Sequence, residues 1–193
     1  MTVKAISERH NNDQLVTDLI TLGYINPTKP ILDPTYGLGR WWKTNKPPHL
    51  HAHDLNPNKS PLPPADFTNL PYPNNFFDAV IFDPPYKLNG TSQGYGNDES
   101  YGVGNTHYIS IQERHNLIKN GITECARVTK RTLIVKCQDQ VSSGKVQWQT
   151  RIFADHAENI GLTLIDSLHV VGGRPQPAGT TQKHARRRLL NRL

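Results

Sequence analysis

Cysteines and long apolar stretches are both scarce in this sequence. Cys125 and Cys137 are the only cysteines among 193 residues, and their spacing fits neither a disulfide framework nor a metal site. No segment approaches the roughly 20 apolar residues of a membrane-spanning helix, and Met1–Lys4 begins no apolar signal region. We therefore expect a cytoplasmic protein (in the host's cytoplasm if a phage encodes the chain).

Hydrophobic residues are also few, whereas prolines, glycines and basic residues are frequent. The chain is 35% hydrophobic and contains 15 prolines and 14 glycines, and its mean hydropathy is −0.61. This composition predicts a single domain over residues 1–193, with a modest core and long loops. The net charge of +6 favours a polyanionic partner such as nucleic acid.

The most informative stretch is an apolar run that ends in an acid and two prolines. Residues 76–82 are rich in aromatic and β-branched side chains, as in a central parallel strand. Because prolines cannot extend a ladder, Asp83-Pro84-Pro85-Tyr86 predicts a stiff corner. Asp83 and the Pro84 carbonyl would accept the two hydrogens of an exocyclic amino group, while Tyr86 stacks on the ring. The alternative is an ordinary turn after a core strand.

Two further acids follow predicted strands upstream. Residues 30–33 end at Asp33, and Gly37-Leu38-Gly39 follows, where glycines allow the backbone to approach a ligand closely. Residues 49–54 end at Asp54, the position from which an acid in a Rossmann-like sheet reaches the ribose of a nucleotide cofactor. On one face of this strand lie three histidines, for which we favour packing or surface roles and predict no metal: His49, His51 and His53.

The remaining pattern predicts an α/β fold, a mostly parallel, twisted, Rossmann-like sheet with helices on both faces. The expected helices are 11–22, 108–128 and 147–159, and the expected later strands are 132–137 and 162–171. Asp66-Phe67 marks the predicted end of a third strand. The Pro-rich segment 56–64 excludes one crossover helix and the first crossover is short, so the sheet is reduced in its first half. Trp41 and Trp42, in that first crossover, are expected in the core.

Two segments outside this pattern are candidates for nucleic-acid contacts. Residues 87–107 contain five glycines and no periodicity, which favours a flexible loop that covers the site or contacts nucleic acid, with plain disorder as the alternative. The basic tail, residues 174–193, contains no acid and is either a phosphate-binding patch or a solubilising terminus. The candidate contact residues are Lys87, Tyr95, Tyr101, Lys183, Arg186, Arg187 and Arg188.

Taken together, these motifs resemble the S-adenosylmethionine-dependent amino-methyltransferases of DNA, the N6-adenine and N4-cytosine enzymes. The resemblance implies a class I methyltransferase fold, S-adenosyl-L-methionine as cofactor, and Asp83, Pro84 and Tyr86 as catalytic residues. The matching pieces run in family order over residues 31–86, but the chain has no room for a separate target-recognition domain. The residues that the resemblance places around the cofactor are Asp33, Thr35, Gly37, Gly39, Asp54, Asp66 and Phe67.

The resemblance implies methyl transfer to the exocyclic amino group of a base in DNA, and adenine N6 is favoured over cytosine N4. The alternatives are a ribosomal-RNA guanine-N2 methyltransferase, with RNA as the partner, and a catalytically silent nucleic-acid-binding subunit of a methyltransferase complex. Protein methylation at glutamine uses a related corner with Asn in place of Asp, so Asp83 disfavours it. Sequence specificity is expected from residues 87–107, the tail, a second copy of the chain or a partner subunit.

Overall fold

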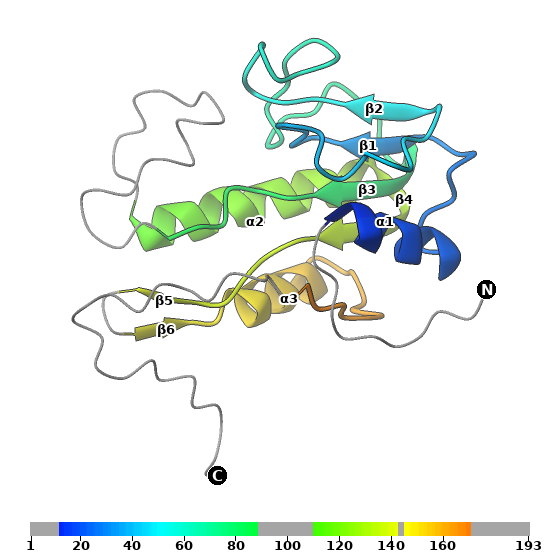
Figure 1. Cartoon of the computed structure of the whole chain (residues 1–193). Helices are drawn as coiled ribbons and strands as arrows, with labels where there is room; N and C mark the ends of the chain where they lie inside the picture. Colours follow the sequence, from blue (N-terminus) through cyan, green and yellow to red (C-terminus); the bar gives the residue numbers. More distant parts are fainter. Residues whose placement is uncertain (1–11, 89–109, 143–144, 171–193) are drawn as a thin grey trace.

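The protein has a parallel β-sheet with helices on both of its faces (Figure 1). The computed structural model describes residues 12–88, 110–142 and 145–170. In chain order the elements are α1 (Asn12–Thr21), β1 (Ile31–Asp33), β2 (Leu50–Ala52), β3 (Phe77–Phe82), α2 (Ile111–Val128), β4 (Thr129–Val135), β5 (Gln140–Ser142), β6 (Lys145–Gln147) and α3 (Gln149–Asn159). The α/β class, the parallel sheet and the flanking helices predicted from the sequence are confirmed.

The four parallel strands lie in the order β2-β1-β3-β4. β3 is central and nearly all of its residues are buried, which its apolar run requires. From β1 the chain moves outward to β2 and then returns to pair β3 with the other side of β1. The strand order therefore reverses between β1 and β3, and open α/β sheets bind ligands at the carboxyl ends of strands at such a point.

Two clusters of buried side chains cover the two faces of the sheet. On one face α2 packs against alternate residues of β3, and its buried members are Ile118, Ile122, Cys125 and Val128. On the other face the cluster contains Leu15, Val16 and Leu19 of α1 together with Trp41 and Trp42. The tryptophan pair belongs to the core, as predicted, at 2% and 3% exposure. No helix occupies either crossover between β1 and β3, so the reduced first half of the sheet is confirmed.

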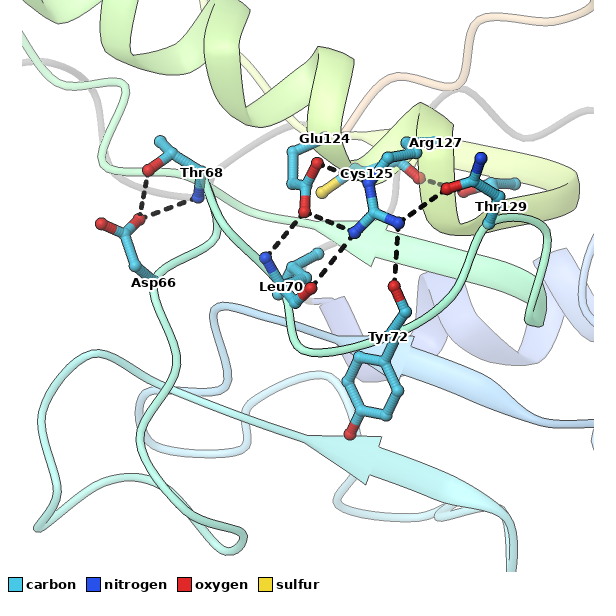
Figure 2. Close-up of polar contacts among 9 residues, drawn as sticks. Asp66, Thr68, Leu70, Tyr72, Glu124, Cys125, Arg127 and Thr129 are labelled. Atoms are coloured by element: carbon cyan, nitrogen blue, oxygen red, sulfur yellow. Dashed lines mark hydrogen bonds and ion pairs between the residues drawn. The ribbon is translucent and has the colours of Figure 1, made fainter.

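Arg127, in the last turn of α2, fixes the segment that leads into β3. Its guanidinium donates to both Glu124 carboxylate oxygens and to the carbonyls of Leu70 and Tyr72 (Figure 2). Glu124 also accepts from the Leu70 amide at 2.7 Å. At the other end, α2 begins with a capping box between Ser110 and Glu113. The start of α2 is therefore held by a local capping box, and its last turn is tied to the distant segment at Leu70 and Tyr72.

Two predicted strands are absent from the structure, and one hairpin was not predicted. Residues 162–170 form no strand. Most of them are exposed, including Leu164 at 60% and Ile165 at 67%, and Asp166 accepts from the Tyr24 hydroxyl at the surface. No strand ends at Asp66, which makes only an isolated bridge to Asn69. The antiparallel hairpin β5–β6 follows the sheet instead. Within the described ranges, no helix is both long and apolar enough to cross a membrane.

Candidate active site at the carboxyl ends of the strands

Three acids lie at the same edge of the sheet, because the parallel strands β1, β2 and β3 all end there. Asp33 is the last residue of β1, and Asp54 and Asp83 lie just beyond β2 and β3. Their charges act on one another: burial first, and then the neighbouring carboxylates Asp83 and Asp54, raise the pKa of Asp33 to about 7. The edge predicted from the sequence thus brings these three residues together.

Asp33 is fully buried and is held by two neighbours. Its Oδ2 accepts from Trp42 Nε1 at 2.7 Å, and its Oδ1 accepts from the Thr35 amide at 3.0 Å. These hydrogen bonds oppose the rise in its pKa that burial causes. With 0% exposure, the Asp33 carboxylate affects the site through its charge and by fixing the turn that follows β1.

The glycine turn after β1 is fastened to Asp54. Gly37 and Gly39 have φ values of 54° and 62°, which L side chains rarely adopt. A Cβ at Gly39 would also lie 2.6 Å from the Tyr36 hydroxyl. Asp54 accepts from the Gly37 amide at 2.8 Å through Oδ2 and from the Asn56 amide at 2.9 Å through Oδ1. The turn therefore needs glycines and a carboxylate at these positions.

Asp83 accepts hydrogen bonds from three side chains. Its Oδ2 accepts from Trp41 Nε1 at 3.0 Å, Lys136 Nζ at 3.0 Å and Asn12 Nδ2 at 3.4 Å. Its backbone amide donates to Thr35 Oγ1, which ties β3 to the turn after β1. The side chain is 20% exposed, so the carboxylate reaches the surface while one of its oxygens is held by the protein.

The residues after Asp83 form the tight corner that the prolines predict. The Pro84 carbonyl accepts from the Tyr86 amide at 2.7 Å, so one of its lone pairs is already in use, which the sequence did not indicate. The Tyr86 carbonyl accepts from the side-chain amides of Gln140 and Gln149. Gln149, at 0% exposure, anchors the corner to the start of α3. The corner is consequently fixed by its own backbone hydrogen bond and by the side chains of Gln140 and Gln149.

Lys136 was missed in the sequence, where it formed part of an apolar strand. It follows β4, the neighbour of β3, and its ammonium lies 5.7 Å from the Trp41 ring centroid and 5.8 Å from that of Tyr86. The signal in the sequence is a lysine directly after an apolar strand, when the strand beside it is followed by an acid. Trp41 and Trp42 were predicted in the core, but their hydrogen bonds to the acids were not: one indole N–H goes to each of Asp83 and Asp33.

Other predicted site residues lie apart from these acids or outside the described residues. Asp66 is exposed and accepts from the amide and hydroxyl of Thr68 (Figure 2). Phe67 packs edge-on against Phe82, with 5.1 Å between ring centroids, and is part of the core. Lys87 is exposed directly after the corner. Predicted contacts that lie outside the described residues are Tyr95, Tyr101, Lys183, Arg186, Arg187 and Arg188.

His51 and His53 make hydrogen bonds and ring contacts within the protein. Both ring nitrogens of His53 have partners, the Pro63 carbonyl and the Tyr72 hydroxyl. His51 packs edge-on against Tyr72 and Phe77. In the ranges 12–88, 110–142 and 145–170, no group of three or more His, Cys, Asp or Glu residues could hold a metal ion.

Comparison with known proteins assigns the chain to no family. No family model matches the chain, and no curated protein matches it. The case for a function therefore depends on the chemistry of the acidic edge, in which Asp33, Asp54 and Asp83 lie beside a glycine turn and an aromatic corner.

Proposed function

We propose that this chain is an S-adenosylmethionine-dependent methyltransferase of reduced class I fold that acts on the exocyclic amino group of a base in DNA, at adenine N6. One observation carries the proposal. A half-buried carboxylate, Asp83, follows the central strand where the strand order reverses, and it lies beside Tyr86. Asp83 thereby combines an acceptor for an amino group with a neighbouring aromatic face for a base.

The residues of the edge fit the cofactor in charge and in hydrogen bonding. Three neighbouring carboxyl groups favour a cation such as a sulfonium. The pKa of Asp33 is raised mainly by burial and, to a smaller extent, by the charges of Asp83 and Asp54. Asp54 uses one lone pair on each oxygen for backbone amides, which leaves further lone pairs for ribose hydroxyls. Gly37 has no side chain of its own to obstruct a ligand, whereas the Tyr36 ring covers the backbone at Gly39.

In the proposed reaction the protein aligns the amino group. When bound, the cofactor would supply an electrophilic methyl group with a neutral thioether as leaving group. Asp83 accepts one amino hydrogen and the second lone pair of the Pro84 carbonyl accepts the other, which directs the nitrogen lone pair out of the ring plane. The proton released after transfer passes to Asp83 Oδ1 or to water. Alignment of this kind can lower a barrier by about 7–11 kcal/mol.

Access to a base in duplex DNA requires that the base leave the stack, at a cost of about a few kcal/mol. Stacking on Tyr86 would offset part of that cost, and the exposed Lys87 next to the corner is suited to a backbone phosphate.

Covalent catalysis by a thiol is disfavoured near the corner, because burial raises the pKa of Cys137 to about 11.

The deciding experiment compares two aspartates of the same strand. Asp83 and Asp78 each form an ion pair, at 3.0 Å with Lys136 and 2.9 Å with Arg131, and their side chains are 20% and 19% exposed. They lie at opposite ends of β3. Asp83→Ala should abolish formation of N6-methyladenine, measured by mass spectrometry of nucleosides from DNA incubated with protein and cofactor, while cofactor affinity measured by calorimetry changes little. Asp78→Ala should retain activity.

Turnover retained by Asp83→Ala would refute the role of Asp83. Loss of activity in both variants would show that the ion pairs of β3 serve stability rather than chemistry. A thermal unfolding curve for each variant separates these cases. Asp78→Ala breaks a partly exposed ion pair and should cost about 0–1 kcal/mol, whereas Asp83→Ala also removes the acceptor of the buried Trp41 N–H, which costs about 1–3 kcal/mol.

A further inference from the structure

Lys136 is the part of the acidic edge that the proposed mechanism leaves without a role. Its ammonium lies 3.0 Å from Asp83 Oδ2, and the two side chains are 25% and 20% exposed. A carboxylate accepts hydrogen bonds and an ammonium only donates them. The site therefore presents an acceptor and a donor side by side at a place that solvent and a ligand can reach.

The position of the ammonium suits contact with the edge of a stacked base. Lys136 Nζ lies over the Tyr86 ring, 5.8 Å from its centroid. Aromatic pairs have ring centroids about 4.5–7 Å apart, so a base placed against Tyr86 would have the ammonium within reach of its edge. Among the described residues the ammonium donates to Asp83 alone, and two of its three hydrogens remain for a ligand.

We propose that Lys136 donates to the ring nitrogen next to the reacting amino group, N1 of adenine, while Asp83 holds the amino group itself. This inference rests on the proposed function and narrows its substrate. Adenine presents an amino donor at N6 beside an acceptor at N1, and cytosine presents N4 beside N3. The Watson–Crick edge of guanine presents donors at both N1 and N2, and the ammonium has no lone pair to accept from N1.

Lys136 is therefore a specificity-determining residue that favours adenine and cytosine over guanine when the base presents its Watson–Crick edge. Two other roles make different predictions. If Lys136 only anchored Asp83, its removal would slow all substrates alike. If Lys136 occupied the place of the amino group and had to be displaced, its removal would speed methylation.

The test removes the acceptor from the substrate instead of altering the protein. A duplex is made with a site at which methyladenine is mapped in DNA from cells that express the protein, and its target adenine is replaced by 1-deazaadenine. Wild-type kcat/KM should fall by about 10- to 150-fold, the effect of a lost hydrogen bond to a charged group. A duplex with 7-deazaadenine keeps N1 and should retain its rate.

The same duplexes are then assayed with Lys136→Met, which keeps the length of the side chain and removes its donors. The variant should lose the part of the 1-deaza penalty that depends on a donor, because it has none for N1 to engage, and the ratio that remains measures the intrinsic difference between the two bases. This comparison also corrects for any intrinsic difference in reactivity between the two bases. If the variant fails to fold, the wild-type comparison of 1-deazaadenine with 7-deazaadenine, which keeps N1, serves in its place.

Equal wild-type rates on adenine and 1-deazaadenine would overturn the inference and leave the proposed function standing. The same 1-deaza penalty in Lys136→Met, or a faster rate of that variant on adenine, would also overturn it. A wild-type protein that methylates no adenine at all would overturn the proposed function, and the inference with it.

Discussion

Replacement of Asp33 by Asn should change how stability depends on pH. Burial raises the pKa of the Asp33 carboxyl from 3.8 to about 7 in the folded protein. Below its unfolded pKa the group is protonated in both states, and between about pH 4 and about pH 7 only the folded state holds the proton. The contribution of the Asp33 carboxyl to the free energy of unfolding is therefore greatest below about pH 4. It falls as the pH rises and is lost above about pH 7. At about 1.4 kcal/mol per pH unit, the loss amounts to about 4 kcal/mol.

Asn has no proton to lose, so Asp33→Asn should lack this decline. Urea unfolding across the range from about pH 4 to about pH 8 should show the variant gaining about 4 kcal/mol relative to wild type. Asn has one acceptor oxygen for the two donors, Trp42 Nε1 and the Thr35 amide. The unpaired donor costs about 1–3 kcal/mol at every pH, which lowers the whole curve without changing its slope.

Parallel curves for wild type and Asp33→Asn would refute this account of the buried acid. Trp42→Phe provides a second check. The Trp42 indole N–H is the larger of the two hydrogen-bond influences that lower the Asp33 pKa, so its removal should move the pH dependence to higher pH. A variant whose curve moves toward lower pH would contradict the direction of that influence.

Two further substitutions test the glycine turn and the core. Asp54→Ala should weaken S-adenosylmethionine binding, measured by calorimetry, by about 1–3 kcal/mol, because the Gly37 and Asn56 amides lose their acceptor; unchanged affinity would show that this turn does not bind the cofactor. Gly121→Ala would place a Cβ 2.6 Å from Phe82 Cζ and should destabilise the fold by about 1–3 kcal/mol through overpacking. Gly23→Ala tests the opposite case, because a Cβ there meets no atom within 4 Å but the φ of 80° strains an L side chain. Equal stability of the Gly121→Ala variant and wild type in urea would show that the rings move aside.

The parts of the site that sequence predicted depend on local signals. The apolar run of β3 and the two prolines fix where Asp83 stands, and the glycine pair marks the turn after β1, because only glycine adopts its positive φ values readily. Parallel pairing then brings the carboxyl ends of neighbouring strands together. No assumption about distant contacts is needed for these features.

The partners of the acids could not be predicted in the same way. Trp41 lies 42 residues from Asp83 in the chain and Lys136 lies 53 residues from it, so their convergence depends on tertiary packing. The strand predicted at residues 162–171 failed for a related reason: its apolar alternation includes Asp166, which bonds to Tyr24 at the surface. The hairpin β5–β6 was missed although Ser143-Gly144, a turn-favouring pair, separates Val141 from Val146.

The tryptophan pair has two tasks in this small protein, so the same local opening affects both. Where larger α/β sheets use a crossover helix, this chain covers the sheet with two indoles that also hold Asp33 and Asp83 in place. Any local opening that frees α1 and its loop from the sheet would release both acids at once. Loss of activity should accordingly precede global unfolding as the temperature rises, with hydrogen exchange near residues 41 and 42 marking the step.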